Sequence, residues 1–219
     1  MSVSELFAAG GIVMWPLLLF SIVTLVLTIE RSVFWFRINR RQRPLVRRAL
    51  ELYREQPAEV FPLLKRNLSF PMVRIFLEAL QLEGASQNQF RLALEGAAYA
   101  ERPLLKRFNS VFQTVIAIAP LLGLLGTILG LIRSFASVRI GEIGANANAV
   151  TGGISEALVS TAAGMIVAIF ALAVFNIFRS FYRRQLDLLQ ESISQLEILY
   201  EWHCQRASNQ ESVPHARIQ

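Results

Sequence analysis

Three polar side chains in long apolar stretches of this sequence have the chemistry of a proton or ion pathway. Thr127 lies in one stretch, and Glu156 and Thr161 lie at the start of another. A carboxylate at the centre of a bilayer costs about 2.5–3.5 kcal/mol, so it is normally placed against polar partners or water. A threonine hydroxyl both donates and accepts hydrogen bonds, so it can solvate a neighbouring group in either protonation state.

Both threonines belong to stripes of small residues. At about 100° per residue, one helix face carries Ala119, Gly123, Thr127, Gly130 and Ser134, and another carries Gly153, Ala157, Thr161, Gly164, Ala168 and Ala171. In lipid, such stripes let helix backbones approach closely, because apolar surface alone gives no preference for protein over lipid. The stripes predict ordinary helix packing through their glycines and alanines, or a polar pathway along their threonines.

Glu156 has two interpretations. It is either a protonatable group at the mouth of a pore or an interfacial acid at a helix N-terminus, where the helix dipole favours negative charge. It projects to the border of the second stripe and not into it. The sequence leaves both interpretations open.

Composition and motifs disfavour an enzyme. The sequence has no GxSxG, HExxH, P-loop or GxGxxG pattern. Its two histidines, His203 and His215, lie near the C-terminus, and its one cysteine, Cys204, excludes an intramolecular disulfide or a cysteine-based metal site. We therefore expect no catalytic residues, no metal and no cofactor.

The stretches that hold these residues are long enough to cross a membrane. Residues 6–29, 108–132 and 157–178 contain no charged residue, and 53% of the 219 residues are hydrophobic. About 20 apolar residues in a helix span the hydrocarbon core. The sequence predicts an all-α membrane protein with three transmembrane helices.

The positive charges orient these helices. Residues 1–30 hold no Arg or Lys, whereas residues 31–107 hold 15 of the 22 basic residues. This segregation is typical of membrane topology and not of a nucleic-acid-binding surface. The positive-inside rule predicts an external N-terminus and a cytoplasmic C-terminus.

The chain divides accordingly into six segments. They are 1–36 (N-terminus and first span), 37–107 (cytoplasmic, helical), 108–135 (second span), 136–152 (short external loop), 153–179 (third span) and 180–219 (cytoplasmic helix and tail). Ser86 and Gln89 fit a capping box, and Pro103 is expected to interrupt or kink the helix that follows. Pro57, Pro62 and Pro71 punctuate the earlier helices. Apolar residues at helical spacing in 180–204 predict a helix that packs on its own cytoplasmic segment or on another subunit. We expect the last dozen residues to form a disordered tail.

Three stretches of the sequence resemble the ExbB/TolQ/MotA proton-channel family. They are APLLGLLGTILGLIRSF (119–135), GGISEALVSTAAGMIVAI (152–169) and GGIVMWPLLLFSIVTLVLTIER (10–31). The paired GxxGTxxG and ExLxxTxxG patterns carry the resemblance. The three-span order is similar to that of the ExbB and TolQ branch and differs from that of MotA, which has a fourth span. Within this branch, the stretch 10–31 is most similar to the first span of ExbB.

The resemblance implies a homopentamer in the bacterial inner membrane, surrounded by lipid, with external segments in the periplasm. Its central pore would hold the single spans of two copies of an ExbD- or TolR-like partner that carries a membrane Asp. Thr127, Thr161 and Glu156 match the family's polar pore residues. Proton flow would drive a TonB- or TolA-like protein and hence transport across the outer membrane.

Three alternatives remain open on the sequence. One is a TolQ-like role in envelope integrity, and another is a non-conducting membrane scaffold in which Gly123, Gly130, Ala157, Gly164 and Ala168 only pack helices. A self-contained solute transporter is weaker, since three spans without inverted repeats leave little room for a site.

Overall fold

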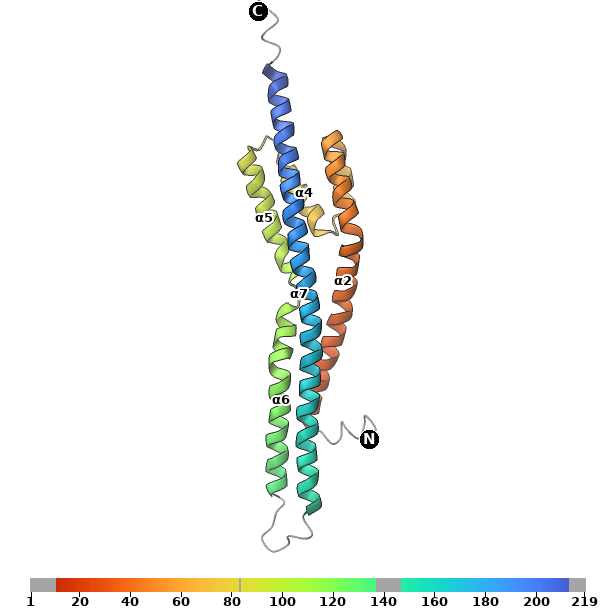
Figure 1. Ribbon diagram of the computed structural model, residues 1–219, viewed down its shortest axis with the longest axis vertical. Helices are drawn as coiled ribbons and strands as arrows, with labels where there is room; N and C mark the ends of the chain where they lie inside the picture. The colour runs from red at the N-terminus through yellow and green to blue at the C-terminus, as the bar shows by residue number, and fades with distance from the viewer. Residues whose placement is uncertain (1–10, 83, 137–146, 213–219) are drawn as a thin grey trace, which may run out of the picture. The chain divides into compact units, whose positions relative to one another are not determined.

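The computed structural model describes residues 11–82, 84–136 and 147–212, and within these ranges it contains helices and no strands (Figure 1). The helices are α2 (Met14–Glu55), α3 (Pro57–Lys65), α4 (Pro71–Leu80), α5 (Gln87–Leu105), α6 (Asn109–Ala136) and α7 (Ala147–Ser212). The predicted all-α class is confirmed. The chain forms two compact units, residues 1–32 with 108–179 and residues 33–107 with 180–219. We call the first the membrane unit and the second, after the location predicted for its segments, the cytoplasmic unit.

The membrane unit contains the first part of α2, all of α6 and the first part of α7. In Figure 1, α6 and this part of α7 lie side by side. A small apolar cluster joins the three helices and consists of Val13, Leu17, Val115, Ala119, Ala168 and Ala171. The cluster is rich in small residues, as expected where helices approach closely in lipid.

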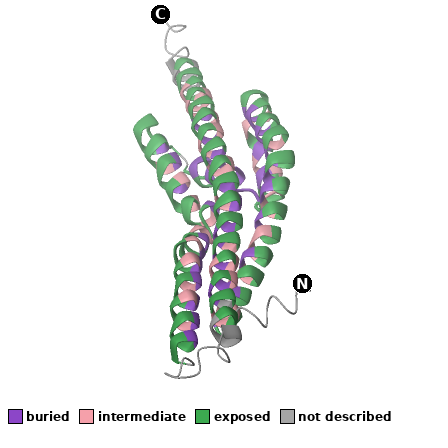
Figure 2. Ribbon diagram, turned by 60° about the horizontal axis from the view of Figure 1, so that its bottom comes forward, coloured by how far each residue is buried: buried purple, intermediate pink, exposed green. Residues whose placement is uncertain are grey.

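Three helical stretches in the described residues are long and apolar enough to cross a membrane, and they confirm the three predicted spans. Fewer than a third of the residues in each span are buried within the chain. The exposed residues of these helices, drawn in green in Figure 2, include many large apolar side chains. In water such a surface would be strongly unfavourable, whereas in lipid it carries little cost.

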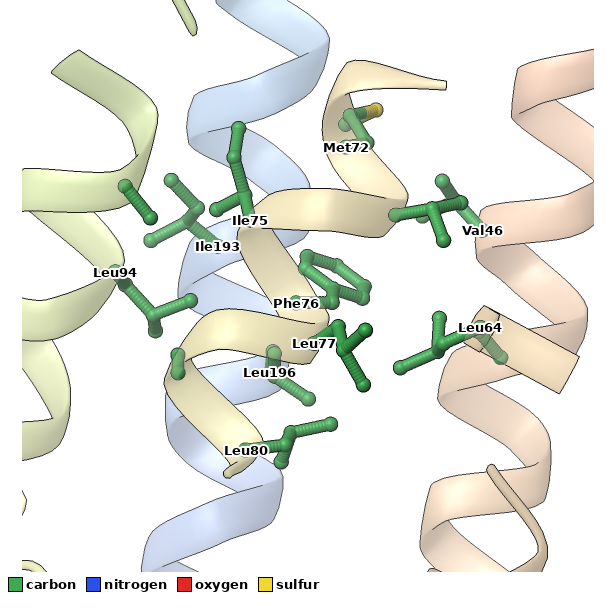
Figure 3. Packing of buried hydrophobic residues seen from close by; sticks show 14 of the residues in the cluster. Val46, Leu64, Met72, Ile75, Phe76, Leu77, Leu80, Leu94, Ile193 and Leu196 are labelled. Atoms are coloured by element: carbon green, nitrogen blue, oxygen red, sulfur yellow. The ribbon is translucent and has the colours of Figure 1, made fainter. Parts of the chain in front are cut away.

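The cytoplasmic unit has a conventional hydrophobic core. Figure 3 shows α4 at its centre, where Phe76 and its neighbours contact side chains of α2, α3, α5 and α7. The contributions of α7 are Leu189, Ile193 and Leu196, all buried. The amphipathic stretch 180–204 therefore packs on its own cytoplasmic segment, which is the first of its two interpretations. The tail predicted for the last residues falls mostly outside the described ones.

Several helix boundaries follow from local sequence. Ser86 caps α5, and its side chain and that of Gln89 form the reciprocal bonds of the predicted capping box. Pro57 and Pro71 begin α3 and α4, where a proline loses no helical hydrogen bond.

The interruption expected at Pro103 does not occur, because α5 continues through it to Leu105. A proline two residues from a helix end removes one N–H donor, and the backbone N–H of Lys106 still bonds to the carbonyl of Arg102. The chain instead turns at Phe108, whose positive φ of 66° is unusual for a non-glycine residue.

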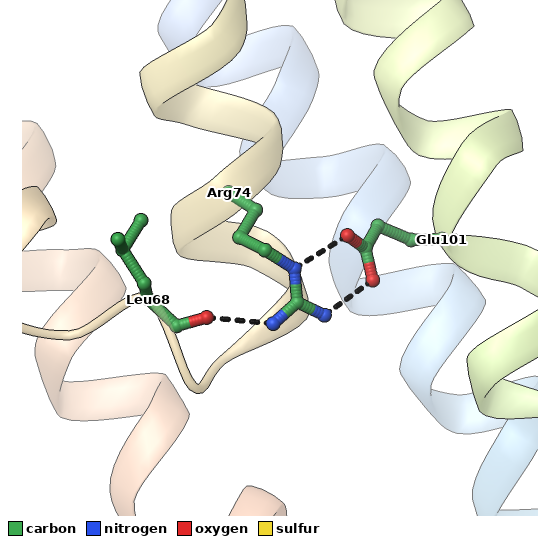
Figure 4. A network of polar contacts seen from close by, with 3 residues as sticks. All are labelled: Leu68, Arg74 and Glu101. Atoms are coloured by element: carbon green, nitrogen blue, oxygen red, sulfur yellow. Dashed lines mark hydrogen bonds and ion pairs between the residues drawn. The ribbon is translucent and has the colours of Figure 1, made fainter.

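An ion pair fixes the turn before α4 (Figure 4). The guanidinium of Arg74 donates to both carboxylate oxygens of Glu101, and its Nη1 donates to the carbonyl of Leu68 at 2.6 Å. The hydrogen bond to Glu101 raises the pKa of Arg74 above its usual value. A two-point contact of this kind holds both partners in one orientation.

The core predicts a sharp contrast between two leucines of α5. Leu94 is fully buried, whereas Leu92 is 62% exposed. Leu94→Ala should lower the free energy of unfolding by about 2–5 kcal/mol, because it leaves a cavity in the core. Leu92→Ala, the matched control, should change it by less than about 0.5 kcal/mol. Urea unfolding of the full chain in detergent, followed by circular dichroism, measures both. Equal losses would contradict the core assigned here.

Candidate functional site

The two small-residue stripes pack against each other within one chain. A Cβ added to Gly123 would lie 3.0 Å from the Cα of Thr161, and one added to Gly130 would lie 3.1 Å from the Cβ of Ala157. Contacts as short as these leave no room for a side chain at either glycine. The structure therefore brings Gly123, Gly130, Ala157 and Gly164 into one interface between α6 and α7, and Ala168 is buried further along α7.

A backbone carbonyl of α6 accepts hydrogen bonds from α7 at the centre of this interface. The hydroxyl of Thr161 donates to the carbonyl of Gly123 at 3.0 Å. The fully buried Ser160 donates to the carbonyl of Ala157 at 2.8 Å and lies 3.4 Å from the same Gly123 oxygen. Glycine makes this carbonyl accessible, since no Cβ stands between it and α7.

Thr127 lies one helical turn beyond Gly123 on α6, at about 40° from it around the helix. Its side chain is half-buried, and its hydroxyl donates to the carbonyl of Leu124 at 2.6 Å. The structure therefore places Thr127 and Thr161 beside the same turn of α6. Each hydroxyl has donated its hydrogen to a backbone carbonyl, so its lone pairs remain free to accept.

Glu156 lies in α7, but its side chain is outside what the structure describes. The helix begins at Ala147, so Glu156 lies more than two turns inside it. The dipole effect falls off within the first turn. A helix-terminal acid was one interpretation of Glu156, and the position of the residue in α7 gives that interpretation little support.

Sequence reasoning missed two polar residues of α7. Ser160 is buried in the contact with α6, and Asn176 is an exposed amide at about 60° from Thr161 around the helix. Asn176 interrupts an otherwise apolar span, which is the signal that singled out the threonines. Ser160 also interrupts this span, but serine is common in tightly packed helices and therefore predicts no more than packing.

The remaining candidate groups lie in the cytoplasmic unit. The Nε2 of His203 lies 2.9 Å from the carbonyl oxygen of Tyr53, and its ring packs edge-on against that of Tyr53, so the residue is part of the packing. Burial raises the pKa of Tyr53 to about 12, which keeps its phenol protonated. Among the described side chains, no three His, Cys, Asp or Glu residues gather as a metal site requires.

Comparison with known proteins extends over most of the chain. Residues 67–191, which include both threonine-bearing stretches, match the MotA/TolQ/ExbB proton channel family. The biopolymer transport protein ExbB-like 3 of Synechocystis sp. is 58% identical, over 88% of this chain and 92% of its own length. The ExbB-like 1 protein of the same organism is 41% identical over 89% of this chain and 77% of its own. The biopolymer transport protein ExbB of Salmonella typhimurium is 32% identical over 76% of this chain and 71% of its own length.

The interface predicts that two glycines of α7 respond differently to the same change. A Cβ on Gly164 would lie 2.5 Å from the carbonyl oxygen of Ala119, whereas a Cβ on Gly152 would meet nothing within 4 Å. Gly164→Ala should therefore destabilise the chain by about 1–3 kcal/mol through overpacking. Gly152→Ala should be neutral, or stabilise the helix by up to about 1 kcal/mol.

Thermal unfolding of the full chain in a mild detergent measures this difference. The comparison keeps the substitution, the helix and the added volume constant. If Gly164→Ala unfolds at the wild-type temperature, α6 and α7 do not pack through these stripes.

Proposed function

This chain belongs to the MotA/TolQ/ExbB proton channel family, in which it groups with proteins named ExbB, and we propose that it uses Thr127 and Thr161 to pass protons. In this role it is the channel-forming subunit of a complex that converts the proton-motive force into work. The names of its relatives describe biopolymer transport, and the work proposed for this chain is transport across the outer membrane.

The arrangement of the two threonines supports this proposal more than any other observation. Both hydroxyls lie beside one turn of α6, and both bond to backbone carbonyls through their hydrogens. In this state they accept hydrogen bonds, as a protonated carboxyl group requires. Rotation of a hydroxyl turns it into a donor, as an ionised carboxylate requires. A pair of threonines can thus solvate a carboxyl group before and after it releases a proton.

The carboxyl group itself comes from a partner. We propose that a single-span, ExbD- or TolR-like protein places a membrane Asp against these threonines. An Asp in an apolar environment keeps its proton until polar groups favour the ionised form. Glu156, near the start of the span that holds Thr161, would attract protons toward this site.

The single chain leaves room for assembly with other subunits. Fewer than a third of the residues in each span are buried in the single chain, which leaves surface for contacts with other subunits, a partner and lipid. We propose that five copies pack around a central pore that holds two partner spans, with lipid around the outside. A TonB-like protein then receives the work. One proton crossing 100 mV releases about 2.3 kcal/mol, so several are needed for each mechanical step.

The proposed location is the bacterial inner membrane, with the N-terminus in the periplasm and the C-terminus in the cytoplasm. The clustering of basic residues between 31 and 107 and after Arg179 supports this orientation.

Removing the two hydroxyls tests the function. Thr127→Val and Thr161→Val should each abolish energised uptake, since valine keeps the shape of threonine and removes the hydroxyl. Assembly should persist, because polar contacts between membrane helices average only about 0.6 kcal/mol. The measurement is outer-membrane uptake driven by the proton-motive force, in a strain where this chain replaces the resident ExbB protein. Native mass spectrometry checks the pentamer in parallel.

Thr114→Val is the matched control. Thr114 also lies on α6 and bonds to its own helix, at the carbonyl of Ser110, but it is exposed and lies on the opposite side of the helix from Gly123. The Thr114→Val variant should leave uptake unchanged, whereas Glu156→Gln should reduce uptake. Full uptake in the Thr127→Val, Thr161→Val double variant would falsify the role of the hydroxyls and favour a scaffold.

The single cysteine provides a natural label site for testing the orientation. Cys204 is exposed on α7 in the cytoplasmic unit. A membrane-impermeant maleimide should label it only after the inner membrane is opened. A Cys204→Ser, Ser4→Cys variant should be labelled from the periplasm without such treatment. The reverse pattern would contradict the orientation.

A further inference from the structure

One face of α2 changes abruptly from apolar to basic. Along this face the exposed residues at helical spacing are Ile22, Leu25, Val26, Ile29, Val33 and Phe36, followed by Arg37, Arg40 and Arg41. The helix is continuous through this stretch. A surface that is apolar over several turns and then basic suits the boundary between the acyl chains and the head groups of a membrane leaflet.

The arginines line a cavity in the cytoplasmic unit. Its volume is about 470 Å³, and its other walls include Val33 and Phe36 of α2 and Asn67 and Ser69 of the turn before α4. The guanidinium of Arg40 lies 5.3 Å from the centre of the Phe36 ring. The cavity thus presents three positive charges, two uncharged polar side chains and an apolar rim.

The opposite wall is held in place by contacts outside the cavity. The side-chain amide of Asn67 donates to the carbonyl of Leu63 at 2.9 Å, and Phe70 is buried at the other end of the turn. The carbonyl of Leu68 accepts from Arg74, which is itself fixed by Glu101. The turn is therefore preorganised, and a ligand does not have to order it.

The charge of the cavity is not neutralised within the described part of the chain. No described carboxylate lies within ion-pair distance of Arg37, Arg40 or Arg41. The planar guanidinium group binds phosphate through two parallel N–H donors. A phosphate group in this cavity would offset the repulsion among the three arginines.

We propose that Arg37, Arg40 and Arg41, with Asn67 and Ser69, bind the phosphate of an anionic phospholipid whose acyl chains begin at the apolar rim formed by Val33 and Phe36. Val33 and Phe36 favour a lipid over a soluble phosphate, because a soluble ligand gains nothing from an apolar rim. The proposed orientation of the chain assigns this lipid to the cytoplasmic leaflet, but binding itself does not depend on that orientation.

The test uses the full chain in a non-ionic detergent, with native mass spectrometry to count bound lipid. Phosphatidylglycerol should be retained at concentrations where phosphatidylcholine is not. The triple variant R37Q/R40Q/R41Q should bind it more than about tenfold less, since each basic residue near an anionic surface contributes about fivefold. Lysine at the same three positions keeps the charge without the two-point geometry and should bind with intermediate affinity.

The matched control is R47Q/R48Q/R54Q, which removes the same charge from exposed positions further along α2 and outside this cavity. It should bind phosphatidylglycerol as the wild type does. Equal loss in the two glutamine variants, or equal retention of phosphatidylcholine, would overturn the proposal. Displacement of phosphatidylglycerol by glycerol phosphate at similar concentrations would overturn the lipid as the source of the phosphate. The uptake assay of the threonine variants is independent of all these outcomes.

Discussion

The architecture of the membrane unit depends on the close approach of α6 and α7. Helices in lipid gain little from burying apolar side chains against one another, because the acyl chains are equally apolar. Contact must come from dispersion between closely spaced backbones and from polar contacts across the interface. Gly123 supplies both, since it admits the backbone of α7 and offers its carbonyl to Thr161. A larger residue at this position would remove both contributions together.

This constraint also places the functional groups. The small faces of α6 and α7 are used within the chain, so what each helix presents to a partner is the adjoining edge and the apolar residues beyond it. Thr161 contributes to the contact and remains half-buried at its edge, and Thr127 lies one turn away. In the proposed function, packing and proton chemistry therefore share one turn of helix. A threonine suits both purposes, because its methyl group fills space while its hydroxyl bonds to the backbone.

The sequence was sufficient for features that depend on local chemistry or on periodicity. The charge-free spans, the capping box at Ser86 and the small-residue stripes all belong to this class. It did not reveal that the two stripes contact each other, because periodicity identifies the face of a helix and not its partner. It also predicted an interruption at Pro103 that α5 does not show, and α2 continues past Pro44 in the same way. One missing N–H is a local cost that packing of the rest of the helix offsets.

The absence of charge from 108–132 and 157–178 bears on how protons move. A threonine hydroxyl accepts and donates hydrogen bonds but does not release its proton at physiological pH. Such hydroxyls can stabilise a proton carrier in its protonated and in its ionised form, but they do not themselves carry a proton across the membrane. In the proposed function, the carrier is therefore a titrating group from outside these two stretches. Glu156, just before the second of them, can fill that role only near one end, and the proposed function therefore places a partner's carboxyl group along the remaining depth of the membrane.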